Sequence, residues 1–154
     1  MNVVDLFSGK DSFGTVAREH GYDVFSVDVI DSGETALIKD IEFLKKNDIP
    51  FSPDIFWASP PCTTYSIAAI STHRDGVIPR TDFAKKSDRL VKKIIEIFSW
   101  YPNALFYIEN PRGMLRKMPF MRGMPRTTVT YCQYGDNRMK PTDVWSNNLY
   151  SIFN

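Results

Sequence analysis

Short apolar runs alternate with more polar segments along the first 110 residues. Five of these runs have the length and the flanking turn residues that are typical of β-strands, and they cover Asn2–Leu6, Tyr22–Val29, Ala36–Lys39, Asp54–Ala58 and Asn103–Ile108. Three segments between them predict helices: Ser12–His20, Ile41–Asn47 and Asp82–Tyr101. The last is the clearest, because an apolar stripe runs beside its lysines and arginines.

This alternation predicts an α/β fold with a mostly parallel sheet and helices on both faces. In such folds, ligands bind outside the carboxyl ends of the strands. Residues 59–81 are polar and rich in turn residues, and we predict a long loop, which is uncommon unless it is functional. From Pro111 onward the chain is expected to be irregular, with strand-like pieces at Thr127–Cys132 and Asp143–Trp145.

Length and charge narrow the possibilities. At 154 residues and 43% hydrophobic, residues 1–154 are predicted to form a single domain. The net charge of +1 hides an asymmetry: residues 1–58 hold eleven acids and five bases, and residues 59–154 hold seven acids and fourteen bases. We therefore expect residues 1–58 mainly to bind a small cofactor and residues 59–154 to form the catalytic loop and the side that meets a polyanion.

Cysteine content and hydropathy bear on the compartment. Only Cys62 and Cys132 are present, and the N-terminus has no signal-peptide pattern, so a reducing cytoplasm fits best. No apolar run approaches the ~20 residues that a membrane helix needs. We expect no metal site either, because Cys62, His73 and Cys132 lack zinc-ligand spacing.

The first strand and turn fit a nucleoside-binding loop. The turn at Gly9 would let backbone approach a ligand, and Asp28, nineteen residues later, could accept hydrogen bonds from ribose hydroxyls. A tight turn with a solvated aspartate is the alternative. Asp40, just before Ile41, could accept a hydrogen bond from an adenine amine, or it could cap the following helix.

A cysteine and a glutamate follow neighbouring predicted strands. Cys62 comes directly after Pro60 and Pro61, which would hold its thiol in one direction, and flanking hydroxyls with a helix N-terminus would lower its pKa. Glu109 ends an apolar run at the same expected edge. The alternatives are an inert thiol and a solvated acid, but together the two residues predict one catalytic pocket.

In their order along the chain, these motifs resemble the cytosine-5 DNA methyltransferase family. Asp5-Leu6-Phe7-Ser8-Gly9 looks like the family's cofactor loop, Pro61-Cys62 with Ser66 like its nucleophile motif, and Glu109-Asn110 like its catalytic pair. The resemblance implies a Rossmann-like fold that binds S-adenosyl-L-methionine. The implied cofactor-binding residues are Phe7, Ser8, Gly9, Asp28, Val29, Asp40, Ile41 and Pro60.

Family membership would also imply a mechanism. The Cys62 thiolate would add to carbon 6 of cytosine while Glu109 hydrogen-bonds ring nitrogen 3 and the exocyclic amine, so that carbon 5 becomes nucleophilic. The base must be flipped out of the duplex or be single-stranded. Residues 134–140 resemble a shortened form of the family's paired-arginine motif, which implies a catalytic Arg138 and a nucleic-acid contact at Lys140.

The chain departs from the family pattern in its cofactor loop. Gly9 is followed by Lys10 and Asp11 instead of further glycines; Asp11 would disfavour the methionine carboxylate and Lys10 would favour it. Two other readings therefore stay open. One is cytosine methylation in RNA or on a free nucleotide, and the other is a catalytically weak remnant that binds cofactor or DNA.

The segment from Pro111 to Gly135 is basic, with five bases and no acid. We expect it to contact DNA phosphates, with its methionines and Phe120 as apolar wedges near the base, although a solvated basic loop is the alternative. His73, Arg74 and Arg80 in the long loop could close over the substrate. No target-recognition region is evident, so recognition of the target sequence would fall to a separate partner. The expected nucleic-acid contacts are Ser66, Arg112, Arg116, Lys117, Arg122, Arg126 and Lys140.

Overall fold

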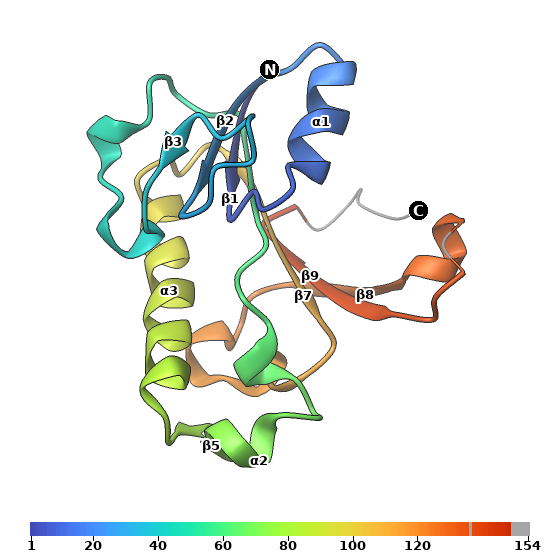
Figure 1. The fold of residues 1–154 in the computed structure, drawn as a ribbon. Coiled ribbons are helices and arrows are strands. Elements are labelled where there is room, and N and C mark those ends of the chain that lie inside the picture. The colour runs from blue at the N-terminus through green and yellow to red at the C-terminus, as the bar shows by residue number, and fades with distance from the viewer. Residues whose placement is uncertain (136, 149–154) are drawn as a thin grey trace.

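The computed structural model describes residues 1–135 and 137–148 and contains a seven-stranded sheet (Figure 1). The strand order is β3-β2-β1-β4-β7-β9-β8, and all neighbours are parallel except at β9, which is antiparallel to β7 and β8. The strands are β1 (Asn2–Leu6), β2 (Asp23–Asp28), β3 (Leu37–Ile38), β4 (Ile55–Ala58), β7 (Leu105–Pro111), β8 (Arg126–Thr130) and β9 (Pro141–Ser146).

Helices α1 (Ser12–Glu19) and α3 (Asp82–Ser99) lie on opposite faces of this sheet (Figure 1). Consecutive residues of β4 show this directly: the Phe56 ring packs 5.3 Å from Phe98 of α3, whereas Trp57 stacks 4.7 Å from Phe13 of α1. Adjacent strand residues point to opposite faces. The predicted α/β fold with a mostly parallel sheet and helices on both faces is thus confirmed.

The main core lies between the sheet and α3. Two short 3-10 helices, η4 (Met114–Lys117) and η5 (Pro119–Met121), continue this layer, and they bury Leu115, Met118 and Met121. The expectation that the methionines of this segment serve as apolar wedges toward DNA is therefore wrong for Met118 and Met121. Burial of their apolar surface in the core is the stronger driving force.

Two elements differ from the sequence expectation. The helix predicted over Ile41–Asn47 is replaced by the 3-10 turns η1 (Ile41–Phe43) and η2 (Lys46–Asp48). The side chains of Asp40 and Asp48 accept hydrogen bonds from the backbone N–H groups of Glu42 and Lys45, respectively. These local hydrogen bonds compete with those of a continuous helix. Strand β7 runs beyond Ile108, because β9 pairs with its last residues.

The segment between β4 and α3 is more ordered than a plain loop. It contains η3 (Thr63–Tyr65), α2 (Ile70–His73) and a hairpin of β5 (Arg74–Asp75) with β6 (Ile78–Pro79). The Arg74 side chain is buried and ion-paired with Asp88 of α3, at 2.6 Å. The expectation that Arg74 closes over a substrate is therefore wrong, since its guanidinium faces the interior.

Candidate functional site

The turn after β1 has an uncommon backbone. Phe7 has a φ of 62°, in the left-handed region that non-glycine residues rarely adopt, and its N–H donates to the Val27 carbonyl at 2.9 Å. Gly9, at φ 53°, donates its N–H to Asp28 Oδ2 at 2.9 Å. Strain of this kind is concentrated at functional sites. The turn thus joins the carboxyl ends of β1 and β2.

Asp28 organises this edge of the sheet. Its second carboxylate oxygen accepts the Ile30 N–H at 3.0 Å. A carboxylate offers about four lone-pair positions, so both oxygens can still accept ligand hydroxyls. The adjoining cavity has a volume of about 510 Å³, within the range of small-molecule sites. It is lined by Phe7, Asp28, Val29, Ile30, Asp40, Ile41, Ser59, Pro61, Phe83, Lys86, Ser87 and Leu90.

Asp40 combines the two roles that the sequence left open. Its Oδ1 accepts the Glu42 N–H and caps η1, and its Oδ2 accepts a hydrogen bond from Lys86 of α3 at 2.7 Å, inside the cavity. Burial alone would raise the pKa of Asp40, but the bonds from Lys86 and Glu42 outweigh it and lower the pKa below its usual value. Asp40 is therefore an ionised acceptor in the cavity wall.

Buried polar atoms gather beneath the β1–α1 turn. Asp5 Oδ2, Ser8 Oγ and Asp11 Oδ1 are buried without a hydrogen-bond partner in the described residues. Such groups are costly unless a ligand or water satisfies them. The 510 Å³ cavity, with the acids Asp28 and Asp40 in its wall, fits a polar nucleoside cofactor such as S-adenosyl-L-methionine.

Asp11 itself is held inside the protein. It has a φ of 59°, its carboxylate pairs with Arg18, and it leaves no room for a side chain at Gly14, where a Cβ would overlap Asp11 Oδ1. Arg18 balances the Asp11 charge, which reduces the repulsion toward a methionine carboxylate that the sequence predicts. Lys10 is exposed on the same turn.

Glu109 lies opposite Ser59, because β4 and β7 run side by side with Ala58 level with Ile108. Its carboxylate hydrogen-bonds the Ser59 hydroxyl and accepts a bond from the Tyr131 hydroxyl at 3.2 Å. Burial raises the pKa of Glu109, although Lys140, Tyr131 and Ser59 each oppose the rise. The group is suited to carry a proton at neutral pH more readily than an exposed glutamate.

Cys62 directly precedes η3, four residues after β4, as a half-buried free thiol, and Ser66, also half-buried, directly follows η3. The Asn110 side chain donates to the Pro60 carbonyl at 2.9 Å, which ties the loop before Cys62 to the residue after Glu109. The two predicted catalytic residues therefore lie on segments that are directly joined. The Asn110 oxygen remains without a partner in the described chain.

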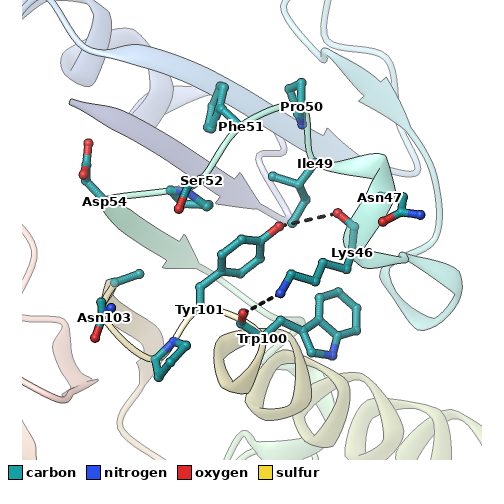
Figure 2. A pocket seen from close by; sticks show the side chains of 13 residues that line it. Lys46, Asn47, Ile49, Pro50, Phe51, Ser52, Asp54, Trp100, Tyr101 and Asn103 are labelled. Carbon is teal, nitrogen blue, oxygen red and sulfur yellow. Dashed lines mark hydrogen bonds between the residues drawn. The ribbon is translucent and has the colours of Figure 1, made fainter.

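Further cavities lie on both edges of the sheet. One of about 370 Å³ is lined by Trp57, Glu109, Val129, Tyr131, Tyr134, Thr142 and Val144. Another, of about 670 Å³, lies at the amino ends of β4 and β7, where Tyr101 and Lys46 face each other (Figure 2). Lys46 donates to the Trp100 carbonyl at 3.0 Å there. That edge is opposite to the one that carries Cys62 and Glu109, so we assign it no catalytic part.

The predicted nucleic-acid contacts divide into two groups. Arg112, Lys117 and Arg122 are exposed and make no ion pair within residues 1–135 and 137–148. Arg116, in contrast, binds both oxygens of the buried Asp143, and Arg126 lies 3.8 Å from the same carboxylate. Gly113 packs so closely on the Tyr65 carbonyl that a Cβ would overlap it, which brings the Arg112 turn against the loop of Cys62.

The two bases of the 134–140 segment differ in surroundings. Lys140 lies 4.8 Å from the Tyr131 ring centre and acts electrostatically on Glu109. Arg138 is exposed. The sequence reasoning missed Ser59, Lys86 and Tyr131. Ser59 carried a signal, since it is level with Glu109 once the two parallel strands are aligned, whereas Tyr131 depends on the β8–β9 connection and had none.

A nucleoside-sized cavity lies at the carboxyl ends of β1 to β4, and the mostly parallel sheet with helices on both faces places the protein in the Rossmann-like class of nucleotide-binding α/β proteins. The family model of C-5 cytosine-specific DNA methylases matches residues 1–119, and the chain belongs to this family. The resemblance predicted from the motifs is confirmed.

Two curated proteins are similar to this chain in sequence. The chain is 29% identical over 153 residues to a Frog virus 3 protein named "Probable DNA (cytosine-5)-methyltransferase", with 95% of this chain and 70% of the relative covered. It is 24% identical over 124 residues to the type II methyltransferase M2.HphI of Haemophilus parahaemolyticus, covering 78% of this chain and 34% of the relative.

Solved structures show the same fold. The Entamoeba histolytica methyltransferase EhMeth superposes with a TM-score of 0.71 at 15% identity, over 100% of this chain and 54% of that chain. The Schizosaccharomyces pombe Dnmt2 methyltransferase gives a TM-score of 0.62 at 15% identity, over 99% and 51%. The chain thus spans about half the length of these neighbours.

In the part of the chain that is described, no helix is long and apolar enough to cross a membrane. Within the same residues, no three histidine, cysteine, aspartate or glutamate side chains are grouped as metal ligands would be.

Proposed function

We propose that the protein is a single-domain enzyme that transfers a methyl group from S-adenosyl-L-methionine to carbon 5 of cytosine in DNA, through a covalent adduct with Cys62. One observation carries the proposal: in a member of this family, the Asn110–Pro60 bond joins the Cys62 loop directly to the strand that holds the half-buried Glu109.

The cofactor would occupy the 510 Å³ cavity. Asp28 would accept the ribose hydroxyls, Asp40 the adenine amine, and the Phe7, Val29 and Ile41 side chains would pack on the base. Ser8, Gly9 and Pro60 would border the methionine end. When bound, S-adenosyl-L-methionine supplies an electrophilic methyl group on a sulfonium sulfur.

The residues around the thiol and Glu109 perform the remaining chemistry. The Cys62 sulfur forms a bond to carbon 6, and the electron pair of the carbon 5–carbon 6 double bond moves toward carbon 5. Glu109 donates a hydrogen bond to ring nitrogen 3 and accepts one from the exocyclic amine, so charge does not build up on the ring. After methyl transfer, carbon 5 loses its proton to solvent, and the sulfur–carbon 6 bond breaks to release the thiolate.

DNA would lie against the basic surface beside this site. Arg112, Lys117 and Arg122, with Ser66 and Lys140 nearer the target base, are proposed to contact it, and Arg138 is proposed to stabilise the flipped cytosine. Arg116 and Arg126 would contribute through their hold on Asp143 as well as by direct contact. Phosphate contacts position a protein without specifying sequence, so a separate partner is proposed to supply recognition.

The decisive test is adduct formation on DNA that contains 5-fluorocytosine, since fluorine cannot leave as the carbon 5 proton does. Incubation with cofactor should give a stable protein–DNA species with wild type and with the control Cys132→Ser, and none with Cys62→Ser. Labelled methyl transfer to DNA, RNA and dCTP is measured in parallel. An adduct that maps to Cys132, or methylation by Cys62→Ser at the wild-type rate, would refute the assignment; transfer only to RNA or dCTP would replace the substrate.

A further inference from the structure

Glu109 is held by more groups than the proposed reaction requires. Trp57, Ser59, Tyr131 and Lys140 surround its carboxyl group on the sheet face that α1 partly covers. The Trp57 indole N–H donates to Ser59 Oγ at 2.9 Å, which leaves the Ser59 hydroxyl hydrogen free to donate to Glu109. From the other side, the Tyr131 hydroxyl donates to Glu109 Oε1 at 3.2 Å.

We infer that Tyr131 is a positioning residue: its hydroxyl fixes Glu109 Oε1, which can still accept a hydrogen bond from the exocyclic amine with its second lone pair, and so orients the other carboxyl oxygen toward ring nitrogen 3. The inference rests on the proposed function of Glu109. Tyr131 begins η6 (Tyr131–Tyr134), directly after β8, and Lys140 directly precedes β9, so the β8–β9 connection supplies both groups.

The Tyr131 ring is itself held. Lys140 Nζ lies 4.8 Å from the ring centre, a cation–π distance, and the ring lines the same 370 Å³ cavity as Glu109. A hydroxyl donor can bond an ionised carboxylate or the carbonyl oxygen of a protonated one, so the contact survives proton transfer at Glu109. The oxygen that faces ring nitrogen 3 is then the one that gains or loses the proton.

The groups that face Glu109 predict the direction of change. Tyr131, Ser59 and the charge of Lys140 stabilise its ionised form against burial. Tyr131→Phe removes one hydroxyl and keeps the ring against Lys140. We expect the Glu109 titration midpoint to rise by roughly 0.5 to 1 unit, and kcat to fall roughly 5- to 10-fold with an unchanged KM for the cofactor.

The titration is followed by carbon-13 NMR of protein labelled at the side-chain carboxyl of glutamate. The chain has five glutamates, and Glu109→Gln identifies the Glu109 signal. Tyr22→Phe is the matched control, because it removes a tyrosine hydroxyl that does not contact Glu109. Tyr22 lines a second cavity, beside Trp57 and Tyr107, and its ring centre lies 6.4 Å from that of His20. The other four glutamate signals report whether each variant is folded, and Ser59→Ala provides a second, independent upward shift.

An unchanged Glu109 midpoint in Tyr131→Phe would overturn the inference, as would a raised midpoint with an unchanged kcat. A raised midpoint together with a lower kcat, and neither change in Tyr22→Phe, supports it. The NMR measurement needs no substrate, so it separates the two proposals. If wild type methylates no cytosine substrate, the proposed function fails and the positioning role with it, whatever the NMR shift shows.

Discussion

Asp5 is a buried acid, only 2% exposed, in β1 just before the cofactor turn. Burial, with Asp11 and Asp28 nearby, raises its pKa to about 7, although Arg18 and the Gly14 N–H oppose the shift. An unfolded aspartate has a pKa of about 3.9. Between these values the folded protein retains a proton at Asp5 that the unfolded chain has lost, so the contribution of Asp5 to stability falls as pH rises from about 4 to 7 and does not change further above that range.

The Asp5→Asn variant removes this titration while keeping a carbonyl oxygen that accepts a hydrogen bond. For wild type we expect the titration of Asp5 to lower the free energy of unfolding by about 4 kcal/mol in total between pH 4 and 7. In Asp5→Asn this decrease should be absent. Urea unfolding at pH 5, 6, 7 and 8 measures it, with Asp23→Asn, exposed at the start of β2, as control. Equal pH slopes in wild type and Asp5→Asn would contradict the assignment.

At the scale of elements, the loop of Cys62 is anchored to α3. The Arg74 guanidinium donates to Asp88, to the Thr64 carbonyl at 2.8 Å and to the Ala84 carbonyl at 3.3 Å, and the Tyr65 hydroxyl donates to Asp88 at 2.8 Å. Breaking a buried ion pair from one side costs several kcal/mol, because the remaining charge is left uncompensated. The loop therefore has a fixed base next to Cys62.

Arg74→Ala should lower the free energy of unfolding by about 3 to 5 kcal/mol and should speed the reaction of Cys62 with a disulfide reagent, because Thr64 and Tyr65 lose their anchor. Arg80→Ala, exposed in the same segment, should change stability by less than about 0.5 kcal/mol. Chemical denaturation and thiol-labelling rates in a Cys132→Ser background give both values. Similar losses in the two variants would mean that the anchor contributes little.

How far the sequence predicts the elements depends on where each hydrogen-bond partner comes from. The strands β1, β2 and β4 and the helices α1 and α3 follow from local periodicity, and their predicted ranges are close to those observed. The end of β7 could not be predicted, since Glu109 pairs with Val144, 35 residues later. For the same reason the sequence predicted that Arg74 lies in an open loop, although its guanidinium is buried and pairs with Asp88 of α3.

Over the whole molecule, the opposite charges of the two halves partly neutralise each other. Lys86 pairs with Asp40 at 2.7 Å and Arg89 with Glu42 at 2.5 Å, so bases of α3 meet acids from the first 58 residues. The basic surface that is expected to meet DNA is therefore smaller than the number of bases in residues 59–154 indicates. Within the described residues 111–135, the bases that are exposed and make no ion pair are Arg112, Lys117 and Arg122, whereas Arg126 is exposed but lies 3.8 Å from Asp143.

DNA affinity should depend on this exposed set. Each phosphate contact contributes about 0.9 to the slope of log affinity against log salt, so replacing all three by glutamine should flatten the slope by about 2 to 3. The control is replacement of Lys85 and Lys93, which pair with Asp82 and Glu96 along α3. Fluorescence anisotropy with labelled DNA at several salt concentrations measures the slopes. Equal flattening by both sets would place the DNA elsewhere.

The contact between Asp11 and Gly14 also constrains how this chain can change over generations. A side chain at position 14 collides with the Asp11 carboxylate, and Arg18 is the counter-charge for that carboxylate. The three positions are therefore epistatic. Gly14 can be replaced by alanine only after Asp11 has been replaced by a shorter residue. That first substitution also removes the ion-pair partner of Arg18. The presence of Asp11 in place of a glycine is thus favoured by the residues that it contacts, Gly14 and Arg18.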